Sequence, residues 1–212
     1  MATLTLIRGA DLVAAPWKNG GGVTREVAAF PANSGLNDFA WRVSIADVAQ
    51  AGPFSRFEGI DRTLVLLSGA GMVLDEADAD EADGPRIVKS HALMQALDIA
   101  RFDGAARIDA RLVDGATRDF NLMVRRDAAH AELDVWREAS KHGEQHDTRR
   151  TFSADVVLLF CASASVTLTL AGAKALQLET GDTLRIDSPN ALHCALEGAG
   201  AVLAISIRYT RR

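Results

Sequence analysis

The chain has 212 residues, of which 48% are hydrophobic and 24% charged, and its formal net charge is −5. This composition is typical of a globular protein with a substantial core. The negative charge disfavours nucleic acid or an anionic membrane as the main partner. The N-terminus alternates apolar and polar residues, and no segment reaches the roughly 18 apolar residues of a membrane span. We therefore expect a cytoplasmic protein without a signal peptide.

Short β-strands dominate the local pattern. Apolar segments are bounded by Gly, Pro, Asn, Asp or Ser, which is typical of strands joined by turns. The expected strands cover residues 3–8, 25–30, 40–48, 62–67, 72–75, 119–126, 156–162, 166–170, 182–187 and 201–209. Helical signals are weak and predict only one turn over 46–51 and a short helix over 130–142. Many short strands at close spacing predict an all-β sandwich or barrel.

A faint internal repeat links two apolar regions. Residues 62–75 and 155–170 begin 93 positions apart, and each reads as an apolar strand, a link of small residues and a second apolar strand. Two such copies fit two similar half-domains. The segment 75–84 has six acidic residues in ten. We expect it to be a solvated loop, because it lacks the residue spacing of a calcium loop.

Residues 16–26 contain three consecutive glycines, Gly20 to Gly22. Glycines cost backbone entropy on folding, but they let a backbone approach a ligand closely and present its N–H groups to an anion. The Walker pattern of nucleotide-binding loops is absent. A flexible connector before a strand explains the same residues, and composition leaves both interpretations open.

Polar residues occupy alternate positions on two of the expected strands, 40–48 and 119–126. The residues on these polar faces are Arg42, Ser44, Asp119, Asn121, Met123 and Arg125. Successive side chains of a strand point to opposite faces, and one face of a barrel strand points inward. The polar faces therefore either line a cavity or face solvent, and the alternation alone does not choose between them.

The sequence contains few residues suited to catalysis or metal binding. Cys161 and Cys194 lie in apolar surroundings and are expected to be buried, reduced thiols. His142 and His146 are four residues apart, but their polar, glycine-containing surroundings favour a solvated loop over a zinc site. The spacings that mark hydrolase elbows, zinc proteases, redox cysteines or dinucleotide loops do not occur.

Four blocks of the sequence, in order, resemble the HutD/Ves family. The first is Trp17 to Gly22 with Thr24 and Glu26, and the second is 41–46. The other blocks are Gly52-Pro53-Phe54-Ser55 with Phe57, Gly59, Asp61-Arg62 and Gly69-Ala70-Gly71, and then Phe102-Asp103-Gly104 with Asp119-Phe120-Asn121-Leu122-Met123. The resemblance covers residues 10–126 as a set of motifs, whereas the rest matches only as a general strand pattern.

The resemblance implies an all-β bicupin, with two cupin-type jelly-roll barrels in one chain. We place the first barrel, which carries the site, at 1–126 and the second at 127–212, with terminal strands free to exchange between them. It also implies an accessory or regulatory role in bacterial histidine utilisation and a ligand such as N-formylglutamate. Metal-binding cupins carry an H-x-H motif that this chain lacks, so we expect neither a metal nor another cofactor.

The sequence thus predicts a non-enzymatic binding protein for a small anionic metabolite, and it leaves a homodimer open. Planar guanidinium groups match carboxylates, and neutral side chains can add hydrogen bonds. The expected ligand-binding residues are Asn19, Thr24, Glu26, Arg42, Ser44, Arg62, Asp119, Asn121, Met123 and Arg125. A metal-independent enzyme acting on a histidine-pathway intermediate is the alternative, and a cavity-facing carboxylate with a strongly shifted pKa would favour it. A pure interaction module would instead have no enclosed cavity.

Overall fold

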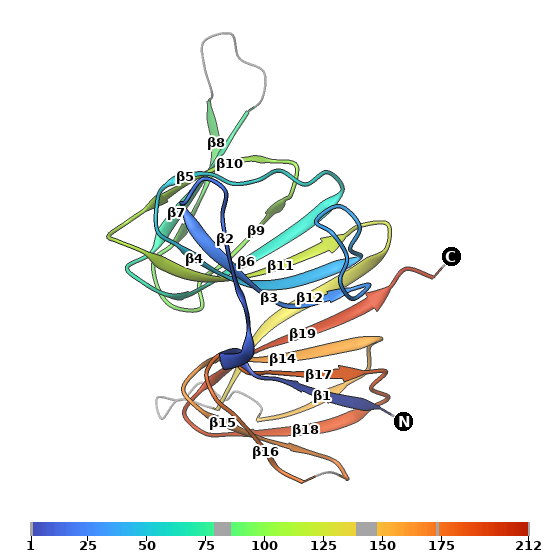
Figure 1. The fold of residues 1–212 in the computed structure, drawn as a ribbon. Coiled ribbons are helices and arrows are strands. Elements are labelled where there is room, and N and C mark those ends of the chain that lie inside the picture. Colours follow the sequence, from blue (N-terminus) through green and yellow to red (C-terminus); the bar gives the residue numbers. More distant parts are fainter. Residues whose placement is uncertain (1, 79–85, 139–147, 173, 212) are drawn as a thin grey trace. The chain divides into compact units, whose positions relative to one another are not determined.

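The computed structural model describes residues 2–78, 86–138, 148–172 and 174–211, and it is built from β-strands (Figure 1). The single helical element in these ranges is a short 3-10 helix, Gly9–Asp11. The prediction of an all-β fold is confirmed. Within the same ranges, no helix has the length and hydropathy needed to cross a membrane.

The chain divides into two compact units. One unit comprises Val13–Ala128, and the other combines Met1–Leu12 with Ala129–Arg212. The N-terminal strand β1 (Thr3–Ile7) joins the C-terminal unit because it pairs antiparallel with β17 (Thr183–Asp187). The sequence suggested a division at 126/127 with terminal strands free to exchange. The observed units divide at 128/129, and the N-terminal strand lies with the second unit.

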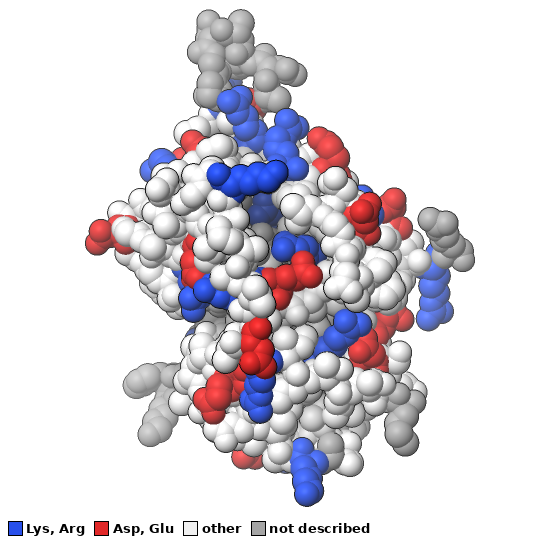
Figure 2. Space-filling view, in the orientation of Figure 1, with Lys and Arg blue, Asp and Glu red and all other residues white. Residues whose placement is uncertain are grey.

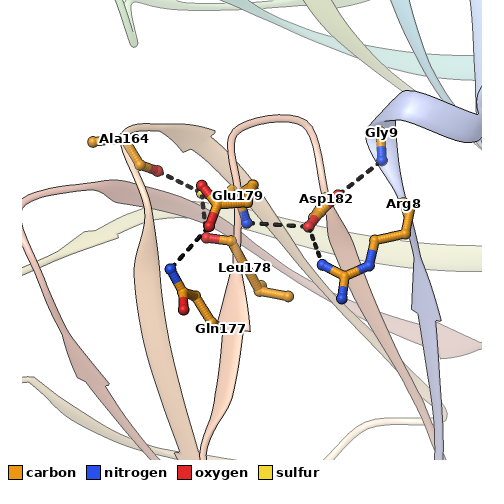
Figure 3. A network of polar contacts seen from close by, with 8 residues as sticks. Arg8, Gly9, Ala164, Gln177, Leu178, Glu179 and Asp182 are labelled. Carbon is orange, nitrogen blue, oxygen red and sulfur yellow. Dashed lines mark hydrogen bonds and ion pairs between the residues drawn. The ribbon is translucent and has the colours of Figure 1, made fainter.

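A buried carboxylate fastens this N-terminal segment to its unit (Figure 3). The Asp182 side chain accepts hydrogen bonds from Arg8 Nη1 at 2.7 Å, from the Gly9 N–H at 2.9 Å and from the Glu179 N–H at 3.1 Å. Burial alone would raise the pKa of Asp182, but these three donors outweigh it and hold the pKa below its usual value. Long-range contacts of this kind cannot be read from local sequence.

The unit 13–128 consists of two antiparallel sheets that share one core. The larger sheet has the strand order β2-β3-β4-β11-β6-β9, and the smaller has the order β5-β10-β7-β8. Their bounds are β2 (Ala14–Pro16), β3 (Gly22–Phe30), β4 (Trp41–Val48), β5 (Gly52–Pro53), β6 (Ile60–Ser68), β7 (Met72–Ala77), β8 (Ile87–Leu93), β9 (Ile99–Asp103), β10 (Arg107–Leu112) and β11 (Thr117–Arg125). Leu64 and Leu66 of the larger sheet pack in one cluster with Met72, Leu74 and Ile108 of the smaller.

The second unit repeats this construction with the sheets β1-β17-β14-β19-β12 and β13-β18-β15-β16. The bounds of the remaining strands are β12 (Ala129–Arg137), β13 (Arg149–Phe152), β14 (Val156–Ser163), β15 (Val166–Leu170), β16 (Leu176–Leu178), β18 (Leu192–Glu197) and β19 (Ala201–Tyr209). Its core is apolar from sheet to sheet, with Trp136 and Phe152 in edge-to-face contact. Cys161 and Cys194 are buried free thiols, and burial raises the pKa of each to about 11.

The two units have the same strand topology over eight consecutive strands. Strands β4 to β11 and β12 to β19 follow the same neighbour order: β4-β11-β6-β9 matches β12-β19-β14-β17, and β5-β10-β7-β8 matches β13-β18-β15-β16. A shared irregularity aligns them residue by residue, because the ladder skips Leu67 of β6 and Ala162 of β14. Leu66 therefore corresponds to Cys161, and Asp119, its partner on β11, corresponds to Val202.

The ten strands expected from the sequence are all present, with small differences at their ends. Neither expected helix is present in the described residues, which cover the second one only up to residue 138. Residues 46–48 continue β4, and residues 129–137 form β12, where cross-strand pairing with β19 overrides the weak helical spacing. In both copies of the sequence repeat the two strands lie in different sheets, so the small residues between them form a sheet-to-sheet crossing.

We predict that Asp182→Ala lowers the free energy of unfolding by about 1.5–3 kcal/mol, because it leaves several donors without their charged acceptor. The folded pKa of Asp182 lies below its usual value. Its contribution is therefore present above about pH 4 and is lost as the pH falls through the lowered pKa. Urea unfolding at pH 7 and pH 3 measures both effects. Asp134→Ala, at an exposed ion pair, should change stability by less than about 0.5 kcal/mol; equal losses in the two variants would refute the assignment.

Candidate functional site

A cavity of about 750 Å³ lies within the unit 13–128, against the inner face of its larger sheet. Polar and charged side chains from β3, β4, β6 and β11 share this cavity with aromatic rings. The lining residues are Ala15, Pro16, Trp17, Lys18, Asn19, Thr24, Glu26, Ser34, Gly35, Leu36, Arg42, Ser44, Ala46, Pro53, Phe54, Ser55, Phe57, Arg62, Asp119, Asn121 and Met123. Figure 2 shows a recess in the surface with basic (blue) side chains inside it and acidic (red) side chains beside them.

Strand pairing places the polar side chains in rows across the sheet. On β11, Met123 lies between Arg42 of β4 and Arg62 of β6. One row further along, Asn121 lies beside Ser44 of β4. Directly opposed residues on neighbouring strands point to the same face. The polar faces of β4 and β11 therefore face the cavity, which decides the choice that the alternation left open.

Arg42 forms an ion pair with a second charged residue of the cavity, Glu26. Its Nε donates to Glu26 Oε2 at 2.7 Å, and its Nη1 lies 3.4 Å from Ser44 Oγ. The Arg42 side chain is 13% exposed, whereas that of Glu26 is 41% exposed. Glu26 therefore orients Arg42 from the solvent side, and the guanidinium keeps further N–H donors for an anion.

Arg62 is buried among aromatic rings. It is 5% exposed, and its guanidinium carbon lies 5.2 Å from the ring centre of Phe54, 5.8 Å from that of Phe57 and 5.1 Å from that of Phe102. Nη1 donates to the Ser55 carbonyl at 3.3 Å, while Nε has no hydrogen-bond partner among the described residues. Burial lowers the pKa of Arg62 to about 10, so the side chain is still charged at neutral pH.

Asp119 is the most deeply buried ionisable residue of the cavity wall. It is 1% exposed, and neither carboxylate oxygen has a hydrogen-bond partner within the described part of the chain. Burial raises the pKa of Asp119 to about 7, Arg62 opposes this shift, and Asp47 adds to it. An unmet buried acceptor costs about 1–3 kcal/mol, and a charged one costs more. The folded protein therefore carries this unfavourable free energy at Asp119, in the cavity wall.

The glycine-rich segment forms an ordered turn. The Trp17 N–H donates to the Gly22 carbonyl at 2.9 Å, and the Gly20 N–H donates to the Trp17 carbonyl at 3.0 Å. Asn19 Oδ1 accepts from the Gly21 N–H at 3.0 Å. The N–H groups of Gly20 and Gly21 therefore donate hydrogen bonds inside the turn.

Nine of the ten residues expected at the site line the cavity, and Arg125 does not. Its Nε donates to the Phe39 carbonyl at 3.0 Å and its Nη2 to the Asn37 carbonyl at 2.6 Å. These bonds hold the loop before β4, so we withdraw Arg125 as a candidate ligand residue. Sequence reasoning missed the aromatic residues Phe54 and Phe57, although both lie in a block that carries the family resemblance.

The described residues contain no group of three or more His, Cys, Asp or Glu side chains arranged to hold a metal ion. His142 and His146 lie outside the described residues, as does most of the acidic segment 75–84. His193 lies elsewhere, in β18, where its Nδ1 is 2.8 Å from Thr151 Oγ1. Arginine, lysine, carboxylate, amide and hydroxyl groups are thus present among the residues that line the cavity.

The second unit shows which residues the shared topology accepts at the positions of Arg62 and Asp119. With the two ladders aligned at their common irregularity, Arg62 corresponds to Val157 and Asp119 corresponds to Val202. Both valines are fully buried in the apolar core of that unit. The eight-strand framework is therefore compatible with hydrocarbon at both positions. Folding alone does not account for the charges in the first unit.

A family model described as HutD matches residues 9–204. An uncharacterized 21.2 kDa protein in the hutC 3' region of Pseudomonas putida is 36% identical over 192 residues, which cover 91% of each chain. Protein Ves of Escherichia fergusonii is 37% identical over 120 residues, or 56% of each chain.

Solved structures of other proteins resemble this chain in fold over nearly its whole length. HutD from Pseudomonas fluorescens SBW25 has a TM-score of 0.75 and 30% identity, and a conserved protein of unknown function from Pseudomonas aeruginosa PAO1 has a TM-score of 0.79 and 29% identity. Each comparison covers 99% of this chain and 100% of the other. Protein Ylba from Escherichia coli, with a TM-score of 0.65, 10% identity and coverage of 99% and 91%, shares the fold.

We predict that Asp119 titrates near pH 7 in the folded protein, compared with about 3.9 for an ordinary aspartate. Because the folded pKa lies above the unfolded one, the protein should lose stability as the pH rises from about 4 through about 7. Carbon-13 NMR of labelled aspartate carboxyls, assigned with Asp119→Asn, measures the midpoint.

The Asp47 carboxylate is a suitable internal comparison. Its hydrogen bond from Arg118 is the largest influence on it, and the pKa of Asp47 is lowered. Asp47 should therefore titrate below its usual value in the same spectra. If every aspartate titrates below pH 5, the electrostatic description of the cavity is incorrect.

Proposed function

The chain belongs to the HutD family, which is related to histidine utilisation, and we propose that it is a non-enzymatic binding protein for a small carboxylic acid. The ligand we propose is an anion of the N-formylglutamate type. The role we propose is accessory or regulatory in histidine utilisation. Binding involves the protein's own side chains and no metal ion.

One observation carries this proposal: two ionisable side chains, Arg62 and Asp119, are buried in a cavity wall where the second unit has Val157 and Val202. Burying charge costs free energy unless it is paired and hydrogen-bonded. Replacing such a pair by hydrocarbon is often neutral or stabilising. Charges retained inside a cavity therefore favour a role in binding over a role in stability.

The dimensions and chemistry of the cavity suit a small dicarboxylate. Its volume of about 750 Å³ lies within the roughly 300–1,000 Å³ typical of small-molecule pockets. Arg42 is the best candidate to bind a carboxylate, since it is held in place by Glu26 and Ser44 and keeps free donors. Lys18 and Asn19 also line the cavity and can contact the anion.

We also propose that each unit is a cupin-type jelly roll, which makes the chain a bicupin. The support is the common neighbour order of β4 to β11 and of β12 to β19, eight strands in two four-stranded sets in each case. In this description β2 and β3 extend the first barrel and β1 extends the second. We assign the ligand site to the first barrel, because the second has Val157 and Val202 at the positions of Arg62 and Asp119 and an acidic residue, Glu132, at the position of Arg42.

One observation favours a second candidate function, metal-independent acid–base catalysis. Asp119 faces the cavity, and burial raises its pKa to about 7, which is the range in which a general acid or base works best at neutral pH. Incubating the protein with histidine-pathway intermediates and following their concentrations by NMR tests this directly. Turnover that Asp119→Asn abolishes would establish the enzyme and exclude the non-enzymatic proposal.

We predict that N-formylglutamate raises the melting temperature of the protein in a saturable way, since a ligand of the native state stabilises it by RT ln(1 + [L]/Kd). Arg42→Ala should weaken binding by about 2–5 kcal/mol, the range for truncating one partner of a buried charge pair. Thermal-shift assays across histidine-pathway intermediates, followed by isothermal titration calorimetry, measure both.

Arg107→Ala is the matched control, because Arg107 is an exposed arginine of the same unit that does not line the cavity. Its affinity should remain within about twofold of the unmodified protein, or roughly 0.4 kcal/mol. Equal losses in Arg42→Ala and Arg107→Ala would point to a nonspecific charge effect and would contradict the proposed site.

A further inference from the structure

The inner end of the cavity is a hydrogen-bond acceptor region. Three oxygen atoms there, both carboxylate oxygens of Asp119 and Oδ1 of Asn121, are buried and have no hydrogen-bond partner among the described residues. Both residues line the cavity, and they are neighbours on the same face of β11. Unmet acceptors in a cavity wall indicate that an occupant with donors completes them.

No side chain among the described residues donates a hydrogen bond to these three oxygens. Opposite Asp119 lie Ala46 of β4 and Leu66 of β6, which have no side-chain donors. Arg62 attracts Asp119 electrostatically, but Arg62 stands between three phenylalanine rings and donates to the Ser55 carbonyl. The guanidinium therefore lowers the electrostatic cost of Asp119 without donating a hydrogen bond to it.

The cavity thus has two chemically different ends. The donor end is Arg42, held by Glu26, and the acceptor end is Asp119. Ser44 and Asn121 are paired in the row between these two ends. Arg42 pairs with Met123, which lies four residues from Asp119 on β11, or about 13 Å along the strand. Side chains extending from both ends shorten this span, leaving room for a ligand with a chain of a few carbons between its two polar ends.

We propose that Asp119, assisted by Asn121, is a specificity-determining residue that accepts a hydrogen bond from an N–H group of the ligand while Arg42 binds a carboxylate of the same molecule. The ligand class is therefore a nitrogen-bearing acid, an amino-acid derivative, and not a plain dicarboxylic acid. This inference rests on the proposed binding function. A plain dicarboxylate satisfies Arg42 but leaves the acceptors of Asp119 unmet.

The experiment compares three probes by isothermal titration calorimetry at pH 8, where Asp119 is ionised. N-formyl-L-glutamate carries the N–H; the formate ester of (S)-2-hydroxyglutarate has oxygen in its place and is otherwise matched; glutarate has neither group. The unmodified protein should bind the amide at least tenfold more tightly than the ester or glutarate, a difference of about 1.4 kcal/mol or more. The ester should be the weakest, since its oxygen places an acceptor against an acceptor.

Variants at Asp119 test the assignment of the residue. Asp119→Leu removes the acceptor and should bring the amide and glutarate to within about twofold of each other. Asp119→Asn keeps one acceptor oxygen and should retain part of the preference. The comparison of probes on the unmodified protein needs no variant, so it holds even if a variant fails to fold, which thermal melting reveals.

The outcomes separate this inference from the proposed function. If glutarate and the ester bind as tightly as the amide, the inference is overturned while the carboxylic-acid binding function stands. If Asp119→Leu weakens all three probes by the same factor, Asp119 is structural and the inference is overturned. If none of the probes binds the unmodified protein, the proposed function fails and the inference fails with it.

Discussion

The burial of Arg62 and Asp119 inside the unit 13–128 is the constraint on which the rest of the site depends. A guanidinium that is 5% exposed requires partners, and the structure supplies them as the faces of Phe54, Phe57 and Phe102. Asp119 then gains a nearby positive charge without a hydrogen bond from it. The aromatic residues thus surround the cation, and both carboxylate oxygens are left without a hydrogen-bond donor among the described residues.

In this fold the strand order does not determine which side chains line the interior. The common strand order of the two units, with the same ladder irregularity, shows that one topology accommodates either valines or an arginine and an aspartate at the same two buried positions. In the second unit Val157 and Val202 join a continuous core. In the first, charges at the same two positions leave a cavity, while the opposite part of the interior keeps an apolar core around Leu74 and Ile108. The difference is made by side chains on otherwise equivalent strands.

Periodicity in the sequence predicted the strands and the residues that share a face. It placed Arg42, Ser44, Asn121 and Met123 together, because side chains alternate strictly along β4 and β11. Periodicity contains no information about where along a strand a cavity ends. For that reason it included Arg125, which lies at the end of β11 and donates to loop carbonyls.

Other features depend on long-range contacts that local patterns cannot encode. The 130–142 helix was expected from three-residue spacing, but residues 129–137 pair with β19 over the full strand. The first twelve residues lie with the second unit because Asp182, far along the chain, gathers Arg8 and Gly9. The rings around Arg62 come from three separate segments of the sequence, so only the folded chain shows their common contact.

The proposed function requires the cavity to bind a small carboxylate through Arg42. Its most direct test is a titration of N-formylglutamate followed by nitrogen-15 NMR of the arginine Nε–H groups. We expect the Arg42 resonance to shift saturably, with a smaller change at Arg62, while the exposed Arg107 outside the cavity remains unchanged. A saturable titration that leaves both Arg42 and Arg62 unchanged would place the ligand elsewhere and contradict the proposed site.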